Sequence, residues 1–325
     1  MPQSRVLKFS DPDAFQAAFR AVDVSLLVTA KGNFHADMMQ VDLGRLLMQQ
    51  SADSLPRIMR ATIGLTRVPI TFLGDMRQRS IHLGGTEFRP GEIIVWGRNA
   101  TGHLRTAAAS RNASMSLRHE DLAAAGRAIA GREISAPLNT VVARPSPRLM
   151  ARLMHLHRAT THLARTAPNV LANRTVAKAL EQQLIHAMVN GLSGDMPRET
   201  ERHGRQHARI ITRFEDFLKA KRYEPVHLAE MCATIGVSER TLRSCCNEHF
   251  GMGPVHYLWL RRMHLARLAL LHADPATASV TSMAMDFGFW ELGRFSVEYR
   301  ALFGESPSAS LRRPLDQTLN QGVLH

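Results

Sequence analysis

Four polar side chains in the C-terminal third can hydrogen-bond the edges of DNA bases: Arg240, Arg243, Ser244 and Asn247. They share one face of a predicted helix. The opposite face of that helix is an apolar stripe of Leu242, Cys245, Cys246 and Phe250. Arginine can read guanine bidentately, asparagine can read adenine, and an α-helix fits the major groove. Phosphate contact or simple solvation is the alternative for each arginine, and we favour groove contact for Arg240 and Arg243.

A second predicted helix offers a less polar face, made of Leu292, Gly293, Arg294, Ser296 and Val297. Its buried stripe is expected to be Phe295, Tyr299, Leu302 and Phe303. Small and apolar groups suit thymine methyls, and Arg294 suits a guanine or a phosphate. We expect this helix to fix the register of the protein on DNA and to contact thymine methyls. For Leu292 and Val297, base contact and solvent exposure remain equally open.

The two helices belong to an internal repeat whose copies begin at Leu228 and Thr281. Met231 and Gly236 pair with Met283 and Gly288, and Phe250 pairs with Phe303. Each copy predicts a short helix closed by a glycine, a turn and a second helix, which is a helix-turn-helix unit. Ser238 is the predicted N-cap in the first copy, and Trp290-Glu291 is expected to open the helix in the second.

A single long helix is predicted between the two units, from Pro254 to His272, with Leu258, Leu265, Leu268 and Leu271 on its buried side. Its length of roughly 28 Å is close to the ~34 Å between successive major-groove faces of a duplex. A rigid helix of this length could hold the two units in adjacent grooves.

The segment GFWELGRFSVEYRALFGESPSASLR, from Gly288 to Arg312, resembles the C-terminal signature of the AraC/XylS regulators. The matching positions are Gly288-Phe289, Phe295, Tyr299, Phe303-Gly304 and Ser306-Pro307. The resemblance covers about residues 206–313 and implies a double helix-turn-helix domain that binds promoter DNA. Many members carry an arginine where Val297 sits, so the resemblance implies that the first unit dominates base reading here.

Residues 1–145 predict short strands such as Ala61–Leu65, Ile70–Leu73, Arg79–Leu83 and Ile93–Trp96, after a short helix over 12–22. This pattern indicates a sandwich or barrel. It resembles, more loosely, the cupin-like effector domains of such regulators, with Gly84 and Pro90-Gly91-Glu92 at a barrel turn. His82 and His103 stand apart, so we expect no metal site and no cofactor.

The predicted fold is therefore α+β with two domains. Residues 1–145 form a cupin-like β-barrel and 146–191 two helices, 147–166 and 169–191, that serve dimerisation or pack on the barrel. A linker follows over 192–205, then the DNA-binding domain over 206–313 and a tail over 314–325.

Charge and cysteine content restrict the interpretation further. The formal charge is +13, but residues from His203 onward carry 15 basic and 12 acidic side chains, a net of +3. DNA binding by this region is therefore expected to depend on a few arginines at specific positions rather than on a bulk positive field.

The three cysteines, Cys232, Cys245 and Cys246, lack metal-type spacing and are expected to be buried free thiols. No leader or membrane segment is predicted, which indicates a cytoplasmic, nucleoid-associated protein.

The leading hypothesis is a sequence-specific regulator, expected to be an activator. It would bind double-stranded promoter DNA as a homodimer, work with RNA polymerase and sense an unknown small-molecule effector. One alternative is a cupin-type enzyme with a helical appendage, but the sequence offers no candidate metal ligands for such an enzyme. The other is an interaction protein with weakened DNA binding. A repair role through an alkyl-accepting N-terminal cysteine is excluded because no cysteine precedes Cys232.

Overall fold

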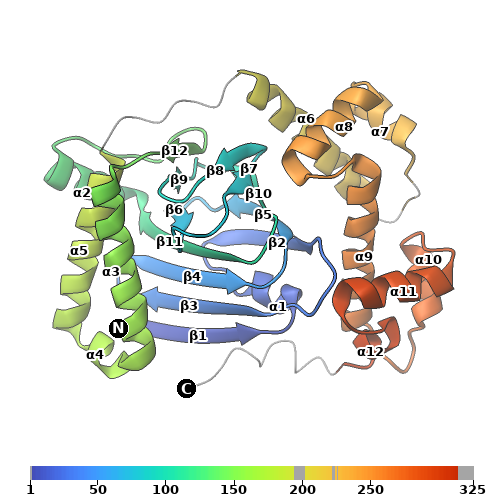
Figure 1. Cartoon of the computed structure of the whole chain (residues 1–325), viewed down its shortest axis with the longest axis horizontal. Coiled ribbons are helices and arrows are strands. Elements are labelled where there is room, and N and C mark those ends of the chain that lie inside the picture. The colour runs from blue at the N-terminus through green and yellow to red at the C-terminus, as the bar shows by residue number, and fades with distance from the viewer. Residues whose placement is uncertain (1, 194–201, 222–223, 225, 314–325) are drawn as a thin grey trace.

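The computed structural model describes residues 2–193, 202–221, 224 and 226–313, and its N-terminal β domain lies beside a C-terminal helical domain (Figure 1). The predicted α+β class, with strands first and helices last, is confirmed. Parts of the predicted linker (194–201) and the tail (314–325) lie outside the described residues.

The β domain consists of two antiparallel sheets. The seven-stranded sheet has the order β1 (Gln3–Phe9), β3 (Ala36–Asp42), β4 (Leu47–Asp53), β11 (Ser110–Arg118), β6 (Arg67–Leu73), β9 (Ile93–Val95), β12 (Val141–Ala143). The five-stranded sheet has the order β2 (Val22–Val28), β5 (Arg57–Ile63), β10 (Thr101–Thr106), β7 (Ile81–Leu83), β8 (Thr86–Phe88). Across the described residues these sheets are separate hydrogen-bonded ladders. All four predicted strands are present, although Leu65 lies past the end of β5 and is exposed.

Both faces of the large sheet bury apolar side chains. Successive side chains of a strand point to opposite faces, so each face packs its own set. Its outer face, which includes Met39, Ile70 and Phe72, packs against helices α2 (His119–Ala130), α3 (Pro147–Thr166) and α5 (Arg174–Leu192) (Figure 1). Its inner face looks toward the small sheet, where Leu73, Ile94 and Trp96 share a core with residues of β2, β5 and β10. The predicted short helix, α1 (Pro12–Ala17), precedes β2 but ends at Ala17 rather than at residue 22, where β2 already begins.

The predicted helix over 169–191 is divided in the structure. A short helix, α4 (Pro168–Ala172), comes first, and α5 starts afresh at Arg174. The cause is Asn173, whose side chain accepts the N–H groups of Thr175 (2.9 Å) and Val176 (3.4 Å) and so caps α5. Helix α2, which packs on α5, was not predicted from the sequence.

The helical domain contains seven helices among its described residues. They are α6 (Arg202–Ala220), α7 (Leu228–Ile235), α8 (Glu239–Phe250), α9 (Pro254–His272), α10 (Val280–Asp286), α11 (Leu292–Phe303) and α12 (Pro307–Leu311). The long helix between the units therefore has the predicted bounds. Both units lie around α9, which stands along the side of the β domain in Figure 1.

Candidate nucleic-acid interface

The first helix-turn-helix unit is formed by α7 and α8, joined at Gly236, Val237 and Ser238. Gly236 has φ 77°, a left-handed conformation that glycine adopts without a steric penalty, and its N–H donates to the Cys232 carbonyl at 2.9 Å. Ser238 accepts the Thr241 N–H at 3.1 Å, which confirms the predicted N-cap. Val237 packs against the core of this unit, so the turn is fixed from both sides.

Helix α8 has one buried and one exposed face. The predicted stripe is buried, as the side chains of Leu242, Cys245, Cys246 and Phe250 show. The predicted base-reading side chains, Arg240, Arg243, Ser244 and Asn247, are all exposed. Arg243 pairs with Glu239 one turn earlier. Because both partners are about half exposed, this pair contributes little free energy and leaves Arg243 available to another acceptor.

The second unit is formed by α10 and α11. Gly288 closes α10 with φ 77°, and Phe289 packs on Phe295 with ring centroids 4.8 Å apart. The expected opening of α11 at Trp290-Glu291 is wrong by one to two residues, because Glu291 occupies the N-cap without a side-chain hydrogen bond and the helix begins at Leu292.

The exposed face of α11 is less polar than that of α8. Gly293, Arg294, Ser296 and Val297 are exposed, whereas Leu292 is half-buried against the core of this unit. Arg294 donates to Glu298 at 2.8 Å. Val297 and Trp290 are each 70% exposed. Trp290, which was expected at the opening of the helix, instead precedes α11 and is largely exposed.

Helix α9 joins the two units and is buried on most of its circumference. Leu258 and Leu271 are buried as predicted, but Leu265 and Leu268 are only half-buried. The reason is that α9 contacts α8, α10, α12 and strand β2 together, so a single apolar stripe does not describe it. A helix held on several sides can act as a rigid spacer.

Arg267 on α9 lies in a buried ion cluster between the two domains. Its guanidinium pairs with Asp11, which caps α1, and donates to Asp13 at 2.5 Å. Arg313 donates to Asp11 at 3.0 Å and to Glu305 at 2.5 Å. Burial raises the pKa of Asp13 to about 6, while Arg267 overcomes the effect of burial at Asp11 and lowers the pKa of that carboxyl.

Glu215 on α6 forms a second buried cluster between the domains. Its carboxylate contacts Arg60 Nε (3.0 Å), His103 Nε2 (2.9 Å) and the Tyr257 hydroxyl (3.2 Å). Burial raises the pKa of Glu215, but these three partners outweigh it and lower the pKa to about 2. His103 is therefore an interdomain contact. No pattern in the sequence pairs it with a residue 112 positions away.

The three cysteines were expected to be buried free thiols, and two of them are fully buried. Cys245 and Cys246 are buried, Cys232 is partly buried, and all three are free. Burial raises the pKa of Cys245 to about 11 and that of Cys246 further. Thiols in this state are poor nucleophiles.

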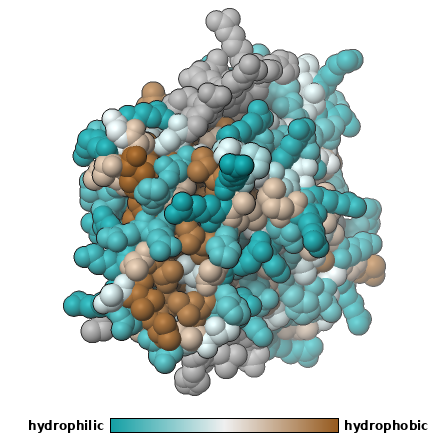
Figure 2. Space-filling model, turned by 60° about the vertical axis from the view of Figure 1, so that its left-hand side comes forward, coloured by the Kyte–Doolittle hydropathy of each residue, from teal (hydrophilic) through white to brown (hydrophobic). Residues whose placement is uncertain are grey.

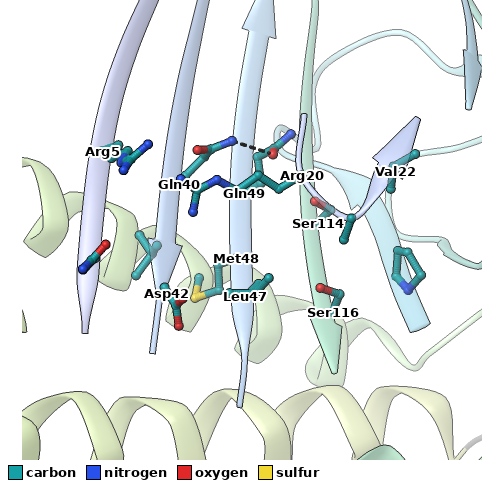
Figure 3. A pocket seen from close by; sticks show the side chains of 14 residues that line it. Arg5, Arg20, Val22, Gln40, Asp42, Leu47, Met48, Gln49, Ser114 and Ser116 are labelled. Carbon is teal, nitrogen blue, oxygen red and sulfur yellow. Dashed lines mark hydrogen bonds between the residues drawn. The ribbon is translucent and has the colours of Figure 1, made fainter. Parts of the chain in front are cut away.

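Two small cavities lie inside the β domain. One, of about 50 Å³, opens between strands β1, β3, β4 and β11 and the segment from Arg20 to Val22 (Figure 3). The other, of about 60 Å³, lies between the two sheets. The described residues contain no cluster of three potential metal ligands and no helix apolar and long enough to cross a membrane.

Residues 231–313 match the family model of a helix-turn-helix domain. The probable thc operon regulatory protein of Rhodococcus erythropolis is 41% identical over 103 residues, which are 32% of this chain and 31% of that protein. The XylDLEGF operon transcriptional activator 3 of Pseudomonas putida is 35% identical over 123 residues, or 38% and 36% of the two chains. The chain thus spans about a third of the length of these relatives.

Among solved structures, the AraC-like transcriptional activator CuxR is similar over 82% of this chain and 95% of its own, with 16% identity and a TM-score of 0.41. ToxT from Vibrio cholerae is similar over 98% of both chains, with 10% identity and a TM-score of 0.31.

Proposed function

We propose that the chain, whose C-terminal domain resembles those of AraC/XylS regulators, is a sequence-specific DNA-binding transcription regulator, an activator that responds to a small-molecule effector. The observation that carries the proposal is the exposed polar face of α8, set on a frame whose other faces are buried. Arg240, Arg243, Ser244 and Asn247 would read bases in one major groove. Gly293, Arg294, Ser296 and Val297 would enter the next groove, with Leu292 at its edge, and RNA polymerase would be recruited beside them at the nucleoid.

The units differ in chemistry, which supports a division of work between them. On α8 the exposed groups include two arginines and an asparagine, the side chains that pair bidentately with guanine and adenine. On α11 the exposed groups are mostly small or apolar, and Arg294 is engaged with Glu298. The first unit would thus specify sequence, and the second would fix register and contact thymine methyls.

Replacing Arg240 or Arg243 with alanine should weaken binding to the preferred duplex by about 1–3 kcal/mol each and relax the preference at the contacted base pair. The duplex can be selected by the full chain from a random-sequence library, and affinities measured by fluorescence anisotropy. Arg158, exposed on α3, provides the matched control, since Arg158→Ala removes the same charge far from the proposed interface. Equal affinity of the wild type and both α8 variants would contradict the assignment of α8.

One feature favours a second candidate, an interaction protein derived from a regulator. Trp290 and Val297 are apolar side chains that are each 70% exposed, and such side chains suit a protein partner as well as thymine methyls. Salt dependence separates the two functions, because neutralising phosphates makes affinity fall steeply with salt concentration. Selection of a preferred duplex together with a steep salt slope supports the regulator. Failure to enrich any duplex supports the interaction protein.

We also propose that α3 provides a homodimer surface. Leu149, Leu156 and Leu163 repeat every seven residues on α3 and remain only half-buried, although Leu153 between them is fully buried. Figure 2 shows this side of the molecule, where hydrophobic residues gather among hydrophilic ones. A second copy packed along the same stripe would bury them.

Leu156→Asp combined with Leu163→Asp should convert a dimer to a monomer at micromolar concentration, because two charges would be buried in the interface. Sedimentation velocity measures the change. His155→Asp, at an exposed neighbouring position, should leave the dimer intact. A wild-type protein that is already monomeric, or a double variant that remains dimeric, would rule out this surface.

A further inference from the structure

The inner face of the large sheet carries a polar row that crosses four strands. Arg5 on β1 lies opposite Gln40 on β3, Gln40 opposite Gln49 on β4, and Gln49 opposite Ser114 on β11. Directly opposed residues project to the same face of a sheet. These four residues, hereafter the polar row, line the 50 Å³ cavity. The same cavity is also lined by apolar side chains such as Leu47 and Met48, and a few polar groups in a partly apolar pocket are typical of a ligand site.

Hydrogen bonds hold the middle of the polar row in place. The Gln40 Nε2 group donates to the Ala18 carbonyl at 2.6 Å and to Gln49 Oε1 at 3.3 Å, the bond drawn in Figure 3. Gln49 therefore uses its oxygen within the row, so its amide N–H groups can face a ligand. The row is a preformed donor surface.

Two arginines give this surface a positive end. Arg5 belongs to the row, and Arg20 reaches the same cavity from the segment between α1 and β2 (Figure 3). Both are exposed, and within the described ranges neither is engaged in an ion pair. Ala21, next to Arg20, has φ 64°, a left-handed conformation that is costly for alanine and is found most often where a site needs it. Asp42 lines the other end of the cavity and accepts the Gly44 N–H at 2.8 Å, so an anion is directed toward the arginines.

The neighbouring 60 Å³ cavity supplies an apolar compartment. It shares Val22, Gln49, Pro69 and Ser114 with the first cavity. Its far wall is formed by side chains of the small sheet, among them Val24, Ala61 and Leu104. A ligand that extends from the arginines past Ser114 would pass from charged to apolar surroundings.

From this arrangement we infer that the β domain binds a small organic anion, a short carboxylate, with its charged group between Arg5 and Arg20 and its carbon chain against Val22 and the small sheet. Carboxylates suit arginine because the guanidinium can donate two parallel hydrogen bonds. Benzene, with six heavy atoms, occupies a cavity of about 150 Å³. The combined space here, about 50 Å³ and about 60 Å³, therefore fits a ligand of roughly four or five heavy atoms. This inference rests on the proposed function, since it gives the effector a chemical class.

Calorimetric titration of the full chain with acetate and propanoate, each beside its amide, tests the inference. We expect propanoate to bind more tightly than acetate, and each carboxylate to bind about tenfold or more tightly than its neutral amide. Arg5→Gln and Arg20→Gln should each weaken propanoate binding by about tenfold. Arg77→Gln, at an exposed position in the turn after β6, should leave it unchanged.

The inference would be overturned by equal binding of acid and amide, or by an effect of Arg77→Gln as large as that of Arg20→Gln. It would also be overturned if neither carboxylate bound. Duplex binding measured on the same variants without ligand separates this failure from failure of the proposed function. If the variants keep their duplex affinity but carboxylates do not bind, only the ligand class is wrong. If carboxylates bind but no duplex is preferred, the anion site stands and the regulator does not.

Discussion

Replacing Arg267 with methionine should lower the free energy of unfolding by about 3–5 kcal/mol, the usual cost of removing one partner from a buried ion cluster. The substitution keeps much of the apolar stem but leaves Asp11 and Asp13 without their main cation, in a region where both carboxyls are buried or nearly so. Arg313 still reaches Asp11, but Asp13 loses its partner. Urea denaturation followed by circular dichroism measures the change.

Two further variants identify the cause. Arg300→Met, exposed on α11, should cost about 0.5 kcal/mol or less. In the double variant Arg267→Met with Asp13→Asn, part of the lost stability should return, because the unpaired buried charge is gone. A cost for Arg267→Met no larger than that for Arg300→Met would show that the cluster does not hold the domains together.

The stability difference between the wild type and Glu215→Gln should depend on acid pH. The pKa of Glu215 is about 2 in the folded protein and 4.5 in its ordinary state, so the ionised form is favoured by folding. This contribution, about 3 kcal/mol, is fully present above pH 4.5 and is lost as the pH falls toward 2. The glutamine side chain of the variant cannot titrate, so the difference between the two proteins cancels the titration of groups that do not contact Glu215, such as Asp13.

Urea denaturation of both proteins between pH 6 and the lowest pH at which both fold provides the measurement. The difference should shrink as the pH falls below 4.5. Asp216→Asn, at the exposed neighbouring carboxylate, should show a much smaller pH-dependent difference. A constant difference between the wild type and Glu215→Gln would mean that His103, Arg60 and Tyr257 do not favour the ionised carboxylate.

Local and periodic features of the sequence predicted much of the helical domain. The repeat located both units, Ser238 and Gly236 marked the turn of the first, and the apolar spacing of α8 separated its buried face from its exposed one. These features are decided by neighbouring residues, through capping, glycine conformation and helical period. The exposed side chains proposed to read bases could be named for the same reason.

The contacts between the domains could not be predicted in this way. Arg267 and Asp11 are 256 positions apart, and each taken alone resembles an ordinary surface charge. The sequence shows His103 only as an isolated histidine, because its partner Glu215 lies in another domain. The break at Asn173 was also missed, since the residues around it continue the apolar spacing of a helix. The anion site depends on cross-strand register, which only the structure gives.

The burial of α9 has a consequence for the proposed DNA binding. Because α9 is packed on several sides, the two units at its ends cannot move apart or turn independently. One base pair rotates the duplex by about 35°, so half-sites moved by two or three base pairs would present the wrong face to α11 while α8 stays engaged. Under the proposed function, the operator should consequently be constrained in phase as well as in sequence. Since Arg267 lies on α9, its ion pairs with Asp11 and Asp13 fix the β domain to the helix that sets the spacing of the two units.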